Sequence, residues 1–131
     1  MESVRSVLSS VNLLTTSPEE PGNEHLVGFV GRDKDSEHKM LARFKLDDNS
    51  QDTFTFVCNI AESVPFFQCD SAILPTRNVE DVTGSRAFTG VVGPTEVSFI
   101  LDDGLEISGK LKTPLDDVTE VTGVGVWVKM A

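Results

Sequence analysis

The chain has 131 residues, a length typical of one domain and sufficient to bury a hydrophobic core without a metal or a disulfide. Its hydrophobic fraction of 39% and charged fraction of 24% exclude a disordered composition, and its eight Phe residues are typical core formers. The net charge of −10 argues against binding to nucleic acid or to anionic lipid surfaces.

Residues 1–24 differ in pattern from the rest of the chain. Apolar residues recur at helical spacing from Val4 to Leu14, which predicts at most one short amphipathic helix, although residues 11–16 fit a strand almost as well. The Pro- and Gly-containing residues 17–23 then form a linker. We expect a cytoplasmic protein without a membrane span, because no signal peptide or long apolar run is present and only two cysteines occur.

From His25 onward, apolar residues recur at every second position, as in strands with one buried and one wet face. Turn residues separate these segments, and Gly104 is placed for the left-handed position of a three-residue hairpin loop. The pattern predicts strands near residues 25–31, 39–46, 53–61, 65–74, 86–92, 95–101, 105–112 and 119–130. Residues 25–131 are therefore expected to form a single all-β domain, an antiparallel eight-stranded barrel or a two-sheet sandwich.

One stretch imitates a nucleotide-binding motif. Residues 104–110 match the Gly-x-x-x-x-Gly-Lys pattern of a phosphate-binding loop, but Leu111 stands where Ser or Thr must hold magnesium. The stretch also alternates like a strand, whereas the motif requires a loop that leads into a helix. We therefore expect no nucleotide and no other cofactor.

The two cysteines are predicted to be neighbours. If residues 62–65 turn the chain between the third and fourth strands, Cys58 lies opposite Cys69 and both sulfur atoms point inward. Such a pair fits either two buried thiols or a disulfide. His25 and His38 are too few for a zinc site, and we interpret them as structural residues.

Acidic residues are concentrated in the predicted loops. In a simple meander alternate loops share one end of a barrel, which would gather Asp47, Asp48, Asp52, Glu80, Asp81, Asp102 and Asp103. Carboxylates of this kind can bind calcium, but the spacing of a known calcium loop is absent. We therefore predict no metal site and interpret these acidic residues as polar turn formers between the strands.

Three apolar residues occupy outward positions in the predicted strands: Val57, Phe66 and Ile100. They form a candidate contact patch, covered either by a second copy or by the chain's own N-terminal segment. With no catalytic motif, the sequence favours a non-catalytic interaction or assembly protein that self-associates or binds a protein partner. The alternatives are a barrel that binds a small apolar ligand, with or without isomerase or cyclase activity, and a calcium-dependent module that uses the acidic loops.

Overall fold

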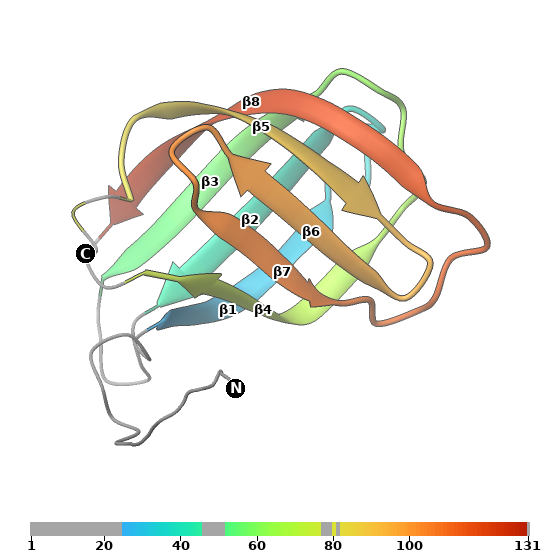
Figure 1. The fold of residues 1–131 in the computed structure, drawn as a ribbon, viewed down its shortest axis with the longest axis horizontal. Coiled ribbons are helices and arrows are strands. Elements are labelled where there is room, and N and C mark those ends of the chain that lie inside the picture. Colours follow the sequence, from blue (N-terminus) through green and yellow to red (C-terminus); the bar gives the residue numbers. More distant parts are fainter. Residues whose placement is uncertain (1–24, 46–51, 77–79, 81, 131) are drawn as a thin grey trace, which may run out of the picture.

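The computed structural model describes residues 25–45, 52–76, 80 and 82–130, and these residues are all-β. The predicted N-terminal helix and linker, as well as Asp47, Asp48 and Asp81, lie outside the described residues. The eight strands close into one antiparallel barrel, so the barrel is the correct one of the two predicted architectures (Figure 1). No α-helix is found in the described part of the chain, and hence none that could cross a membrane.

The strands agree closely with those predicted from the alternation of apolar residues. They are β1 (His25–Arg32), β2 (Lys39–Lys45), β3 (Thr53–Ile60), β4 (Gln68–Pro75), β5 (Ser85–Val92), β6 (Glu96–Leu101), β7 (Glu106–Lys110) and β8 (Thr119–Met130). Only β4 begins well away from its predicted start, because residues 61–67 form a loop rather than the first part of a strand.

The barrel consists of two Greek keys instead of a simple meander. Around the ring the order is β1-β2-β3-β8-β5-β6-β7-β4, and β4 closes the ring on β1. Each half is a three-stranded meander whose fourth strand returns beside its first: β4 pairs with β1, and β8 pairs with β5. On its other side β4 pairs with β7, and β8 pairs with β3, so each fourth strand also pairs with a strand of the other half. The two Greek keys are therefore joined at the β3–β8 and β4–β7 seams.

The loops that complete the two keys, 61–67 and 111–118, are held by equivalent backbone hydrogen bonds. In the first half the N–H groups of Ile60, Ala61 and Val64 donate to the carbonyl oxygens of His38, Thr122 and Glu37, at 2.7, 2.8 and 3.2 Å. In the second half those of Leu111, Lys112 and Leu115 donate to Thr95, Gln68 and Pro94, at 2.9, 2.8 and 2.8 Å. Donor spacing is the same in both sets, and the acceptors lie in equivalent turns and strands. The halves are thus structural repeats, although the sequence shows no clear repeat.

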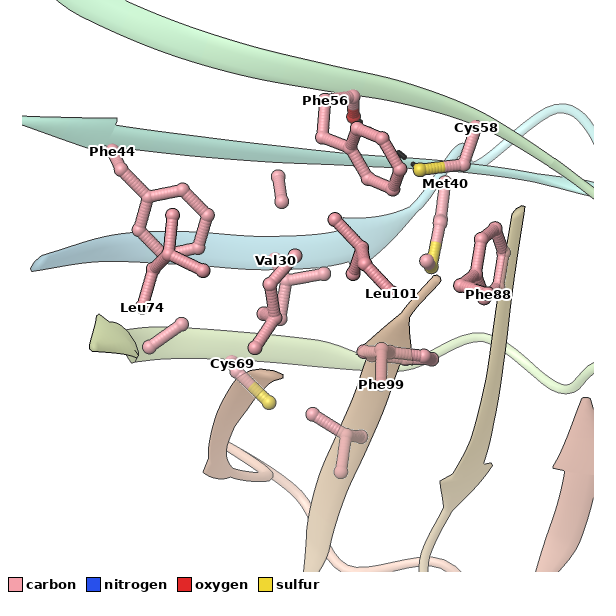
Figure 2. Close-up of a cluster of buried hydrophobic side chains, with 14 of the residues drawn as sticks. Val30, Met40, Phe44, Phe56, Cys58, Cys69, Leu74, Phe88, Phe99 and Leu101 are labelled. Atoms are coloured by element: carbon pink, nitrogen blue, oxygen red, sulfur yellow. Dashed lines mark hydrogen bonds between the residues drawn. The ribbon is translucent and has the colours of Figure 1, made fainter. Parts of the chain in front are cut away.

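The inside of the barrel is filled by aromatic and aliphatic side chains (Figure 2). Six rings form a continuous series of contacts, with centroids 4.7–6.2 Å apart, in the order Phe44, Trp127, Phe56, Phe88, Phe99 and Phe67. Phe44 lies near the end of β2, and Phe67 precedes the start of β4 at the other end of the barrel. The series therefore links the two ends of the core, in tilted and edge-to-face contacts that aromatic rings favour.

The predicted pairing of the two cysteines is wrong, whereas their burial is confirmed. Cys58 lies opposite Met40 and Gly125, and Cys69 lies opposite Val30, because β1 and β2 separate β4 from β3. Both thiols are free and buried. Burial raises the pKa of Cys58, and burial together with the nearby Asp70 carboxylate raises the pKa of Cys69 to about 11. These thiols act as small apolar core groups.

Candidate functional site

Three of the acidic residues that the sequence places in one cluster, Asp52, Asp102 and Asp103, lie beside cations. Asp102 and Asp103 both lie beside the Arg86 guanidinium, at 3.5 and 3.4 Å, and Asp102 also accepts a hydrogen bond from the backbone N–H of Ala87. Asp52 lies 3.6 Å from the ammonium group of Lys129. Within the described ranges, no group of three or more His, Cys, Asp or Glu residues is placed to hold a metal. The carboxylates of Asp52, Asp102 and Asp103 thus take part in local ion pairs and hydrogen bonds.

Apolar side chains cover part of the outer surface where the two Greek keys join. Val57 of β3 lies opposite Val126 of β8, and these side chains are 46% and 41% exposed. On its other side Val57 lies opposite Leu41, and Val124 and Val128 are the next outward residues of β8. Because these residues are adjacent on the sheet, they form one patch rather than scattered exposed residues.

Next to this patch, a hollow of about 480 Å³ crosses the outside of β1, β2 and β3. We call it the aromatic groove and define it by Phe29, Arg32, Lys39, Val57 and Phe66. The Arg32 guanidinium lies 5.5 Å from the centre of the Phe66 ring and donates a hydrogen bond to the Val64 carbonyl oxygen at 3.0 Å. This cation–π contact holds the half-exposed Phe66 ring at the edge of the groove.

The aromatic groove is open because Gly31 contributes no side chain to its lining. A Cβ atom at this position would lie 3.3 Å from the carbonyl oxygen of Phe67, which is a tight contact. Outside the groove the Arg43 guanidinium lies 5.9 Å from the centre of the Phe29 ring, and it donates to the Thr55 hydroxyl at 3.2 Å. The apolar lining is therefore bordered by positive charge.

A second hollow of about 490 Å³ lies over β5, β6 and the start of β8. We call it the acidic groove and define it by Glu62, Val91, Ile100, Glu120 and Thr122. Ile100 is 50% exposed and lies opposite Glu106, whose carboxylate accepts a hydrogen bond from Ser98. Val91 lies opposite Glu120. Here the apolar side chains are bordered by carboxylates.

The three patch residues predicted from the sequence are thus divided between two places. Val57 and Phe66 line the aromatic groove, Val57 from β3 and Phe66 from the loop 61–67. Ile100 lies in the acidic groove of the other half. Sequence reasoning did not single out Phe29 or the outward valines of β8. The feature that indicates their outward position is their alternation with buried residues along each strand.

Three cations outside the aromatic groove lie beside carboxylates, whereas the cations of β2 lie beside none that the structure describes. Arg86, Lys112 and Lys129 each lie within 4 Å of a carboxylate. In the described part of the chain, the outward cations of β2 (Lys39, Arg43 and Lys45) form no such ion pair. In a chain of net charge −10, this strand therefore presents positive charges without a described carboxylate within 4 Å beside exposed apolar side chains.

No family model matches the sequence, and no curated protein or solved structure is significantly similar to it. The two grooves and the apolar patch between them are therefore the basis on which a function can be assigned.

Proposed function

We propose that this protein is a non-catalytic assembly domain that associates with further copies of itself through the apolar outer surface around Val57. The observation that carries the proposal is the adjacency of half-exposed Val57 and Val126, with further outward valines on β8. Complete burial of a Val or Phe side chain stabilises by about 1.5–3 kcal/mol, so covering several half-exposed ones supplies a substantial part of an association free energy.

The filled core supports this function over that of an apolar-ligand carrier. Six aromatic side chains whose rings contact one another occupy the barrel interior, where a ligand carrier would need a cavity. The described polar groups also favour binding over catalysis. Both cysteine thiols are buried with raised pKa values, and the Nδ1 atom of His38 lies 3.1 Å from the Ile60 carbonyl oxygen. Each of these groups is thus used within the fold itself.

Sedimentation of the full chain over a range of concentrations tests the proposal. We expect the average mass to rise with concentration and Val57→Glu to weaken association about tenfold or more, because a carboxylate would have to be buried in the contact. Val118→Glu is the matched control: Val118 is 54% exposed but lies in the loop 111–118, away from the patch. A wild-type chain that stays monomeric, or equal effects of the two substitutions, would overturn the proposal.

A further inference from the structure

The aromatic and acidic grooves share one pair of equivalent strands of the two Greek keys, although their further extents differ. The first lies over β1, β2 and β3, and the second lies over β5 and β6, the counterparts of β1 and β2, and over the start of β8. In the ring of strands these two pairs are separated by two strands on either side, so they lie on opposite walls of the barrel (Figure 1). The two hollows, about 480 and 490 Å³ in volume, thus include opposite walls of one molecule, and their edges on β3 and β8 lie on neighbouring strands. A further hollow of about 500 Å³ lies over β1, β2 and β4.

The two grooves carry opposite charge. Arg32 and Lys39 line the aromatic groove, and Arg43 borders it through its contact with Phe29. Glu62 and Glu120 line the acidic groove, and Glu106 borders it opposite Ile100. A single negative group, Asp33, lines the first groove, whereas the lining of the second contains no cation. The walls of one groove thus complement those of the other in charge.

We infer that the copies associate head to tail, with the acidic groove of one molecule on the aromatic groove of the next; this inference rests on the proposed function. Ile100, half exposed between carboxylates, contacts the surface formed by Phe29, Val57 and Phe66 of the next copy. The carboxylates around Ile100 then face the cations that border the aromatic groove. Apolar burial provides the attraction, and the charges set the orientation.

This head-to-tail arrangement differs from a two-fold symmetric dimer because it leaves a contact surface free on the molecules at its ends. In a symmetric dimer Val57 would meet Val57 and the contact would be complete at two copies. In a head-to-tail contact each molecule keeps one unused groove, so that growth continues unless the chain of molecules closes into a ring. Because the two grooves lie on opposite walls, the geometry favours an open assembly whose average mass passes that of a dimer as concentration rises.

Two substitutions in the full chain, each blocking one groove, test the inference. Val57→Glu places a carboxylate where it faces Glu62 and Glu120 of the next copy. Ile100→Lys places an ammonium group where it faces Arg32 and Lys39. We expect each variant alone to associate about tenfold or more weakly than the wild type in sedimentation velocity experiments. An equimolar mixture should associate again, because one variant keeps its acidic groove and the other its aromatic groove.

The possible outcomes test the head-to-tail contact separately from self-association. If Ile100→Lys associates as the wild type does while Val57→Glu is impaired, self-association stands and the head-to-tail contact is wrong. If both variants remain monomeric when mixed, the head-to-tail contact is again wrong. A wild-type chain that is monomeric at all concentrations overturns both. Val118→Lys serves as the control for adding a lysine, and fluorescence of Trp127 verifies that each variant is folded.

Discussion

Glu62 and Thr122, sixty positions apart in the sequence, form a two-point hydrogen-bonded contact. One carboxylate oxygen of Glu62 accepts the backbone N–H of Thr122 at 2.7 Å, and the other accepts its hydroxyl at 3.0 Å. The contact fastens the loop 61–67 of the first Greek key to β8 of the second. The backbone hydrogen bond from Thr122 is the main cause of the lowered pKa of Glu62.

Glu62→Gln should reduce stability in a pH-dependent way. Because the pKa of Glu62 in the folded protein lies below its unfolded value of about 4.3, its contribution is complete at neutral pH and is lost as the pH falls through the folded value. The melting temperature of the variant should therefore be lower than that of the wild type at pH 7, and the gap should narrow as the pH falls below the unfolded value. Thermal unfolding followed by Trp127 fluorescence measures this. A gap that stays the same from pH 7 to pH 3 would contradict the assigned role.

Gly28→Ala should be among the most destabilising single substitutions in β1. A Cβ atom at this position would overlap the backbone carbonyl oxygen of Arg43, so the β1–β2 ladder would have to separate. We expect a loss of more than about 3 kcal/mol in the free energy of unfolding, measured by urea denaturation. Gly31→Ala on the same strand is the control, with an expected cost of about 1 kcal/mol or less, because its nearest contact is 3.3 Å. Similar losses for both would contradict the prediction.

Phe56→Ala should interrupt the aromatic series at its centre. The Phe56 ring contacts Trp127 at 4.7 Å and Phe88 at 6.1 Å between centroids, and it is fully buried. The expected cost is about 3–5 kcal/mol, the range for deleting a buried aromatic ring. Phe66→Ala removes the same side chain from a half-exposed position and should cost about 1 kcal/mol or less. Chemical denaturation of the two variants gives the comparison, and equal costs would mean that the core tolerates the cavity.

The two thiols should be unreactive in the folded protein. At pH 8 a group whose pKa is about 11, as for Cys69, is ionised in about one molecule in a thousand, and burial further blocks the reagent. A thiol-specific colorimetric reagent should therefore modify neither cysteine in native buffer and both in denaturant. Rapid modification of the native protein, or fewer than two free thiols after unfolding, would contradict the free, buried state of Cys58 and Cys69.

The strands and their inward faces could be predicted because they depend on local pattern. Phe54, Phe56, Cys58 and Ile60 alternate with the other residues of β3, and all four side chains are buried. The contact between Cys58 and Cys69 could not be predicted in this way. Strict alternation identifies the face on which a side chain lies but not the strand beside it. In the fold, the loop 61–67 carries the chain past β2 and β1.

The sequence by itself determined the all-β class, the number of strands and the outward apolar residues, because these follow from the two-residue period of a strand. Only the tertiary structure decided which outward residues share a surface. Val57 and Phe66 meet in one groove and Ile100 lies in the other because β8 returns between β3 and β5. Greek-key pairing joins residues far apart in the chain, and such pairing depends on how whole strands pack together, which no local window of sequence contains.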